Sequence, residues 1–553
     1  MIINFAKIGI YGRFLVKLRR KKIIFCFKKT NFREAKSRIY TPKMLSYFHK
    51  NTLNFIGEKD VRITNHVQMK LGEIDVSRIK IDSKSRDDIP QILRGIQYLY
   101  SQVEIRGKLF EALEKIIPEK IDKSNGRPGM ELWKIFVLGI LRLTLNCDYD
   151  RLQELANQHK TLREMLGHGM LDEHYYYELQ TLKDNVQLLT PKVLEEINQK
   201  IVDEGHRLLK KKEGAKLAAR CDSFVVKTDV HFPTDINLLY DAVRKAIQLT
   251  AKLCEKLDIS NWRQYRYNIK TVKKAYRNAQ QSKRGNTRNE YKKVKQIKEM
   301  HREYIEVAKS FLKKVKETAD YIQGKERITL IQRLQLNEID EYIHHGLRQI
   351  DQIKRRVLDK EVIPSKEKVF SLFEPHTEWI CKGKLGVPVE LGVRVCIVED
   401  KNQFILNHQI MWKQTDEKLT VSIAEETKKK FPNLYSMSYD RGFYSKHNRE
   451  ELHEILDAYS LPKKGKLSET DRLIQSSEDY KKAKEKHSAV ESAINALGVH
   501  GLDKCPDLGK RRFACYVALA IVARNIQLIG AILQKKERRL MVLRERRKRL
   551  KAA

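Results

Sequence analysis

A long, charged helical stretch separates two parts of this 553-residue chain that have the character of β-strands. Leu217–Val230 is rich in small apolar and β-branched residues, which indicates a strand. Residues 236–360 then follow helical spacing, carry many Lys and Glu side chains, and contain very few Gly and no Pro. β character returns only after Pro364. The order predicts a sheet domain whose strands are separated by a large all-helical insertion.

The C-terminal half alternates segments of strand and helix character. The expected strands are Val369–Phe373, Val387–Glu399, Gln403–Met411, Leu434–Tyr439 and Ala458–Leu461. The expected helices are Thr415–Lys430, Ser445–Leu456, Thr470–Leu497 and Arg511–Gln534. Because a sheet of this kind buries both faces, helices flanking a mixed sheet are the natural layering. We therefore expect a mixed α/β domain formed by residues 213–235 and 361–534, with residues 236–360 inserted.

Residues 90–212 have the spacing of short helices joined by polar connectors. The expected helices are Ile92–Ile117, Met130–Leu145, Asp148–Leu155, Thr161–Leu166 and Tyr175–Leu182. Short helices joined by tight turns are what a helix-turn-helix reader of DNA requires, although a purely supporting helical domain has the same pattern. The sequence predicts a helical DNA-binding domain here, with structural support as the alternative.

Both ends of the chain are strongly basic. Residues 1–50 hold 14 Lys and Arg against one acid, Glu34. We expect residues 1–60 to form a loosely ordered arm that contacts phosphates; the alternative is an upstream extension, with Met44 as the initiator. Residues 535–553 form a second basic segment, the C-terminal tail.

The composition favours a polyanionic partner in a reducing compartment. The chain has 110 Lys and Arg against 71 Asp and Glu, a net charge of +39 and a pI near 9.7. The eight cysteines are scattered without a C-x-x-C pair, so neither zinc nor a disulfide framework is expected. The apolar run Phe513–Leu533 contains Arg524, Asn525 and Gln527, which predicts a buried core helix rather than a membrane span. No signal peptide is expected, because basic residues interrupt the N-terminal apolar stretch.

Three acids stand in contexts that suit metal-dependent chemistry. Asp222 lies inside an apolar strand, where a carboxylate is costly unless it is paired or metal-bound. Asp440 ends a strand, and Glu491 falls within the expected helix Thr470–Leu497. Three carboxylates at one sheet edge can hold two Mg²⁺ ions, which activate an oxygen nucleophile against a phosphodiester. We predict Asp222, Asp440 and Glu491 as the catalytic, metal-binding residues.

Each of these acids has an alternative explanation. Asp229 and Asp235 compete with Asp222 as first ligand, although helix capping explains Asp235 well. A neighbouring cation could satisfy Asp222. Asp440 precedes Arg441-Gly442, which resembles an ordinary strand-to-loop turn, and lone helix glutamates such as Glu491 usually face solvent.

Basic side chains near these acids are candidates for DNA-backbone contacts. Such contacts add affinity without base specificity. The candidates are Arg441, Lys446, Arg449, Lys463, Lys464 and His487. His487 could instead orient Glu491 or simply pack.

At these residues the chain resembles the DDE transposases of bacterial insertion sequences, particularly the ISNCY-type group. The segments that carry the resemblance are Cys221-Asp-Ser-Phe-Val-Val226, Val230-His-Phe-Pro-Thr-Asp-Ile-Asn-Leu-Leu239, Ser438-Tyr-Asp-Arg-Gly-Phe-Tyr-Ser445, His487-Ser-Ala-Val-Glu-Ser-Ala-Ile-Asn-Ala-Leu497, His500-Gly-Leu-Asp-Lys-Cys-Pro506 and Ala520-Ile-Val-Ala-Arg-Asn525. The similarity runs from about residue 90 to residue 534. Residues 1–60 match nothing that we can place.

The resemblance implies an RNase H-like catalytic domain with an Asp-Asp-Glu triad at Asp222, Asp440 and Glu491. It also implies two Mg²⁺ ions, for which Mn²⁺ can substitute. Related groups carry Tyr, Arg and Lys around the catalytic Glu, where this chain has Lys484, His487 and Gly498. That departure leaves open how the flanking strand is held and whether a DNA hairpin forms.

The expected function is therefore transposition. The enzyme would bind terminal inverted repeats as a homo-oligomer on DNA, free a 3′-OH by hydrolysis and join it to target DNA. It would act in the cytoplasm, associated with the nucleoid and not with a membrane. The alternatives are an RNase H-like nuclease or resolvase that cleaves without joining, and a non-catalytic DNA-binding relic.

Overall fold

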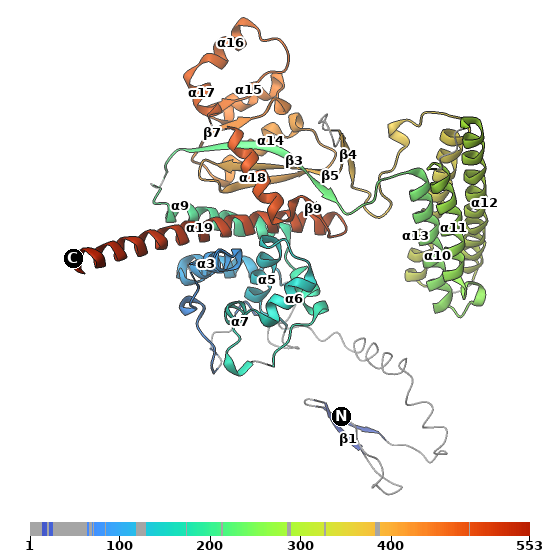
Figure 1. Ribbon diagram of the computed structural model, residues 1–553, viewed down its shortest axis with the longest axis horizontal. Helices are drawn as coiled ribbons and strands as arrows, with labels where there is room; N and C mark the ends of the chain where they lie inside the picture. Colours follow the sequence, from blue (N-terminus) through green and yellow to red (C-terminus); the bar gives the residue numbers. More distant parts are fainter. Residues whose placement is uncertain are drawn as a thin grey trace. The chain divides into compact units, whose positions relative to one another are not determined.

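The structure is a computed structural model of the chain (Figure 1). The residues it describes are 14–18, 21–25, 63–65, 69, 71–82, 84–117, 129–172, 174–211, 214–284, 289–325, 328–381, 388–485 and 487–552. Contacts divide the chain into two units, of which the larger comprises residues 62–118 and 130–553.

In the smaller unit, two short strands pair within the basic N-terminal segment. Strand β1 (Phe14–Leu18) pairs antiparallel with β2 (Lys21–Phe25), with Leu18 opposite Lys21. The remainder of the basic arm expected at residues 1–60, including Met44, lies outside the described residues. The sequence pattern did not predict this hairpin.

Helices fill the first part of the larger unit. They are α3 (Asp88–Ser101), α4 (Val103–Glu114), α5 (Leu132–Thr144), α6 (Tyr149–Gln158), α7 (Lys160–Met165), α8 (Leu179–Val186) and α9 (Pro191–Leu208). The single helix expected over Ile92–Ile117 is wrong, because extended backbone at Gln102 ends α3 before α4 begins. The helix expected at Tyr175–Leu182 begins later, at Leu179.

Helix α5 is the buried centre of this helical region. All of its residues are buried, including two cations. Lys134 pairs with Glu131 at 2.8 Å, and Arg142 pairs with Asp507 at 2.7 Å. A buried cation is tolerable only when it is paired in this way.

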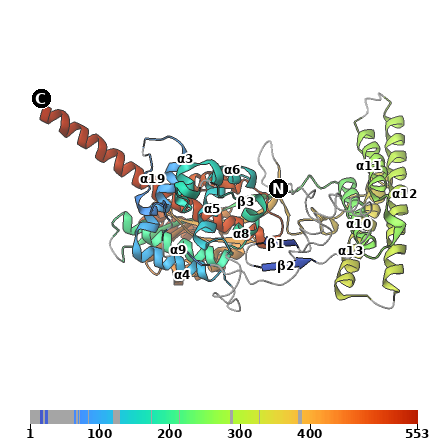
Figure 2. The same cartoon turned by 90° about the horizontal axis from the view of Figure 1, so that it is seen from below.

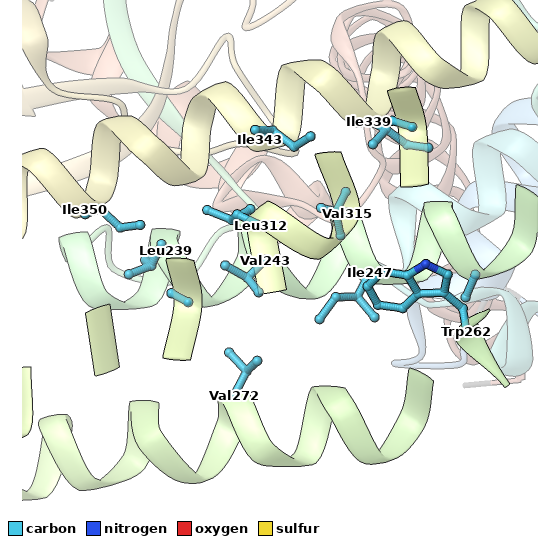
Figure 3. Packing of buried hydrophobic residues seen from close by; sticks show 14 of the residues in the cluster. Leu239, Val243, Ile247, Trp262, Val272, Leu312, Val315, Ile339, Ile343 and Ile350 are labelled. Carbon is cyan, nitrogen blue, oxygen red and sulfur yellow. The ribbon is translucent and has the colours of Figure 1, made fainter. Parts of the chain in front are cut away.

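The helical stretch expected at residues 236–360 is confirmed as helical. It forms α10 (Asp235–Lys256), α11 (Tyr265–Ser282), α12 (Glu290–Gln323) and α13 (Leu330–Ile353), which run alongside one another in both views (Figures 1 and 2). Their apolar sides meet in one core, in which Val243, Val272 and Leu312 pack with residues of α13 (Figure 3). Trp262 donates a hydrogen bond from Nε1 to Thr318 Oγ1 at 3.0 Å. The four helices thus have a hydrophobic core of their own.

Seven of the described strands form one mixed sheet. They are β3 (Leu217–Thr228), β4 (Glu378–Cys381), β5 (Val389–Asp400), β6 (Ile405–Met411), β7 (Leu434–Tyr439), β8 (Ala458–Ser460) and β9 (Lys504–Cys505). One edge of β3 pairs antiparallel with β5; its other edge pairs parallel with β7 and, further along, with β9. Strand β8 pairs parallel with β7, while β4 and β6 pair antiparallel with β5. The expected mixed α/β fold is confirmed at this level.

Within this sheet most strand predictions are confirmed, one is wrong and two strands were missed. No strand forms at Val369–Phe373, because its aromatic rings pack on other rings, Phe370 on Trp379 and Phe373 on Tyr342. Strands β4 and β9 were not expected. The hairpin turn predicted at Asp400 is confirmed, since the Asp400 carboxylate accepts hydrogen bonds from the Asn402 and Phe404 backbone.

Six helices accompany the sheet in the C-terminal half. They are α14 (Asp416–Lys430), α15 (Lys446–Ile455), α16 (Glu469–Ser476), α17 (Glu478–Lys484), α18 (Val490–Leu497) and α19 (Lys510–Ala552). The single helix expected over Thr470–Leu497 is wrong. Ser477 accepts a hydrogen bond from the Tyr480 backbone N–H and starts a new helix, and α18 begins only after a short 3₁₀ turn at His487–Ala489.

Helix α19 is a core helix over its first half, up to Gln534. It is the one helix in the described part of the chain that is long and apolar enough to cross a membrane by composition, but 67% of its apolar window is buried in protein. The fully buried Asn525 bonds the Asn198 side chain and both backbone groups of Ile405. The expectation of a buried core helix is confirmed, although the helix continues well beyond Gln534.

Candidate functional site

Two of the predicted acids are brought together by the parallel pairing of β3 and β7. Cys221 stands opposite Tyr439, so the next residues, Asp222 and Asp440, are neighbours where β7 ends beside the middle of β3. Side chains alternate between faces along a strand. Ser438 and Asp440 therefore share one face of β7, next to the face of β3 that carries Asp222.

The third acid approaches from a helix that packs on β3. Glu491 lies in the first turn of α18, not in the middle of a long helix as the sequence predicted. The preceding 3₁₀ turn is tied to β7, because Ser438 Oγ lies 2.8 Å from His487 Nδ1. Burial lowers the pKa of His487, opposed by the charge of Asp440.

The pKa of Asp222 reports which other acids lie near it. Burial and, to a smaller extent, the negative charges of Asp440, Asp416 and Glu491 together raise the pKa of Asp222 to about 6. The Ser223 backbone N–H donates to Asp222 Oδ1 at 2.7 Å and opposes this rise. Asp440 and Glu491 therefore lie close enough to Asp222 for their charges to disfavour its ionised form.

Asp416 is a fourth acid that sequence reasoning missed. It opens α14, and its Oδ1 accepts a hydrogen bond from Ser223 Oγ at 2.5 Å. Arg394 Nη1 lies 3.4 Å from its other oxygen. An acid in the first turn of a helix is ordinarily explained by the helix dipole, so no local signal distinguished Asp416.

A basic cavity of about 340 Å³ opens beside Asp440. Its cationic lining comes from Arg441 at the end of β7, Lys463 after β8, and Lys484 at the end of α17, with His487 beside them. Of these, Lys484 was named from the sequence only as a departure from the family pattern. Positive charge adjoining a carboxylate cluster suits a phosphate group.

The remaining predicted DNA-binding residues differ in how they are held. Arg449 and Lys463 both pair with Asp471, at 2.8 and 2.5 Å. Hydrogen bonds from Lys463 and from the hydroxyl and backbone N–H of Ser468 lower the pKa of Asp471. Lys464 donates to the Gly442 carbonyl at 3.3 Å, and Lys446 is exposed at the start of α15.

The competing acids near β3 have cationic partners of their own. Asp229 pairs with Lys504 at 2.6 Å, and Asp235, in the first turn of α10, pairs with Arg356 at 2.8 Å. Neither acid is among the main causes of the pKa shift of Asp222. Their surroundings explain them without a metal.

The donor chemistry of the acid cluster fits a hard divalent cation. Among the described residues, however, no group of three or more His, Cys, Asp or Glu side chains lies close enough together to hold a metal ion as the side chains stand. Asp440 and Glu491 are exposed, and the repulsion that raises the pKa of Asp222 is what a bound cation relieves. Carboxylate oxygens are the ligands that Mg²⁺ prefers.

Comparison of the chain with known protein families, with curated proteins and with solved structures finds no match.

Proposed function

We propose that the chain is a DDE-type transposase that cuts and joins DNA at the ends of an insertion sequence. The observation that carries the proposal is the adjacency of Asp222 and Asp440, which directly follow the last paired residues of β3 and β7, with the charges of Asp440 and Glu491 both acting on Asp222. The order of these acids, on a central strand, after a parallel neighbour and on a later helix, is the order that the resemblance implies.

The sheet topology supports an RNase H-like catalytic domain. Strands β3, β5 and β6 are antiparallel neighbours, and β7 and β8 extend the sheet parallel to β3 beyond its other edge. Helix α14 connects β6 to β7, and α15 connects β7 to β8. On this assignment α10–α13 are an insertion between the first strand and the remainder of the sheet.

The proposed chemistry divides the work among the clustered side chains. Asp222, Asp440 and Glu491 would hold two Mg²⁺ ions, which supply an activated oxygen nucleophile and stabilise the leaving oxygen. Arg441 and Lys484, in the cavity beside Asp440, would bind phosphate oxygens of the DNA strand and keep it in register. His487, held by Ser438, would position the turn from which Glu491 extends.

The chain as a whole suits a DNA substrate. Its net charge of +39 favours a polyanion, and the helical region of residues 90–212 is the proposed reader of the terminal inverted repeats. Two ends must be brought together before joining, so we propose a homo-oligomer assembled on DNA and associated with the nucleoid.

The proposal is tested by incubating the purified chain with a DNA carrying the element's ends and a supercoiled target. We expect Mg²⁺-dependent release of a 3′-OH and its joining to the target. Asp222→Asn, Asp440→Asn and Glu491→Gln should each abolish both steps, whereas Asp229→Asn, an exposed ion-paired acid, should retain them. Cleavage without joining would instead support a nuclease or resolvase, and binding without cleavage a relic.

A further inference from the structure

The helix α11 differs from its neighbours in charge. Tyr265–Ser282 contains five basic residues and no acid. Helix α13, in contrast, contains four acids and two basic residues. Both helices pack against α10 and α12, which places them at opposite corners of the four-helix arrangement. The arrangement is therefore electrically polarised, with its positive side at α11.

The five cations of α11 form one stripe that faces away from the core. They are Arg266, Lys270, Lys273, Lys274 and Arg277, which together we call the α11 basic face. All five are exposed. At about 100° per residue they fall within a stripe about 100° wide, on the side opposite the buried Val272 and Ala279.

The α11 basic face lacks the acidic partners that other cations nearby have, although Arg266 donates a hydrogen bond to the Tyr265 hydroxyl at 3.3 Å. None of its five side chains forms an ion pair with any described residue. In α12, Lys309 pairs with Glu306, and Lys316 pairs with Asp320 and Asp340. Arg355, in the π-helical turn that follows α13, pairs with three acids. Five unneutralised cations on one helix repel one another, and a polyanion relieves that repulsion.

The spacing suits a nucleic-acid duplex. From Arg266 to Arg277 the helix rises about 16 Å, a length over which duplex DNA presents about ten phosphate charges. The exposed ring of Tyr267, at 68% of its surface, adjoins the stripe and can contact sugar or phosphate. A membrane-surface helix would need an exposed apolar side, but the apolar side of α11 is buried in the core.

We infer that the α11 basic face is a second DNA-binding surface, which holds the phosphate backbone of a duplex without reading its bases. The choice of DNA over RNA rests on the proposed function. The contact itself does not depend on Asp222, Asp440 or Glu491, so it persists in a protein that cannot cleave.

The test uses the full chain with all five residues neutralised: Arg266→Gln, Lys270→Gln, Lys273→Gln, Lys274→Gln and Arg277→Gln. The matched control removes the same charge from α12 and α13 by Arg302→Gln, Lys309→Gln, Lys313→Gln, Lys316→Gln and Arg333→Gln. Binding to a 40-base-pair duplex of arbitrary sequence is followed by fluorescence anisotropy in EDTA, from 50 to 200 mM salt. Thermal melting establishes that each variant is folded.

The α11 variant should bind at least about tenfold more weakly at 100 mM salt, and its dependence of log K on log salt should be shallower by roughly 3–5. The control variant should lose much less affinity for the duplex. Equal losses in both variants, or no loss in either, would overturn the inference. The inference would also be overturned if the parent protein bound duplex RNA or anionic vesicles more strongly than duplex DNA and the α11 variant lost that stronger binding. Because EDTA removes divalent cations, this assay measures DNA binding alone. It therefore tests the inference whether or not the protein cleaves DNA.

Discussion

Ser438 Oγ lies 2.8 Å from Nδ1 of His487, so the strand that ends at Asp440 is tied to the turn that leads into Glu491. Ser438 is fully buried, and His487 is partly buried. This hydrogen bond links two of the three clustered acids through side chains that are not acids themselves. It gives a way to disturb the cluster without removing any of its carboxylates.

Ser438→Ala should leave the His487 ring nitrogen without that partner and cost about 1 kcal/mol of unfolding free energy. If the turn positions Glu491, metal-dependent cleavage should fall several-fold while DNA affinity stays unchanged. Urea denaturation and a cleavage assay check both expectations. Ser436→Ala, a buried serine two residues earlier on the same strand, is the control. Equal loss of cleavage in the two variants would count against a positioning role.

Asp222 should make the protein less stable as pH rises. In the absence of metal its pKa is raised to about 6 in the folded chain, from 3.8. Between about pH 4 and 6 the unfolded chain releases this proton while the folded chain keeps it, so unfolding free energy falls, by at most about 3 kcal/mol. Asp222→Asn should remove this loss and be the more stable protein at pH 7. Denaturation at several pH values in EDTA measures the difference; parallel curves for the two proteins would refute the assignment.

A bound divalent metal ion should offset the repulsion among the clustered carboxylates and so stabilise the folded chain. A cation bound by the cluster stabilises the folded chain in proportion to the logarithm of its concentration over its dissociation constant. Adding Mg²⁺ or Mn²⁺ should therefore raise the melting temperature of the parent protein, and chelation should restore the original value. Asp222→Asn and Asp440→Asn should shift little, while Asp235→Asn should respond like the parent. An equal shift in all four proteins would place the metal elsewhere.

Arg441 and Lys463 should contribute unequally to DNA binding, although both line the cavity beside Asp440. Lys463 is engaged by Asp471, whereas Arg441 is exposed at the end of β7. Arg441→Gln should weaken DNA binding, and the slope of log K against log salt should become shallower by about one. Lys463→Gln should change binding less and lower the melting temperature instead. Anisotropy titrations at several salt concentrations, with thermal melts, compare the two; a larger binding loss at Lys463 would contradict the ion-pair assignment.

Asn525 should be essential for stability. It is fully buried and satisfies the backbone N–H and carbonyl of Ile405 together with the side chain of Asn198. Asn525→Ala leaves the Ile405 N–H and the Asn198 side-chain oxygen without these bonds, although Asn198 Nδ2 still donates to the Ile405 carbonyl, and it should cost about 3 kcal/mol. Asn495→Ala, an exposed position on α18, should change stability by less than about 0.5 kcal/mol. Chemical denaturation of both variants gives the comparison, and similar values would show that the buried network contributes little.

Periodicity in the sequence predicted the elements that position the site. The strand Leu434–Tyr439 has the bounds that the pattern indicated, and the adjacency of Asp222 and Asp440 follows once β3 and β7 pair. Such segments are readable because burial on both faces selects apolar, β-branched residues over their whole length.

What the sequence could not show depends on contacts made elsewhere in the chain. Periodic polarity continues across Thr470–Leu497, but Ser477 caps a new helix within it, so the path to Glu491 is broken. Asp416 joins the acid cluster through Ser223, which is far from it in sequence. The aromatic segment Val369–Phe373 has strand composition, yet its rings pack on other rings without joining the sheet.

The position of β3 at the centre of the sheet has a consequence for biosynthesis. Asp222 stands opposite Ile397 of β5, and the end of β3 pairs with β9 at Lys504–Cys505. At typical translation rates of about 5–20 residues per second, β3 waits on the order of ten to thirty seconds for β5 to be made. Helices α10–α13, which have their own core, are complete in that interval. We therefore expect the nascent chain to expose an unpaired β3 strand, with Asp222 in it, until late in synthesis.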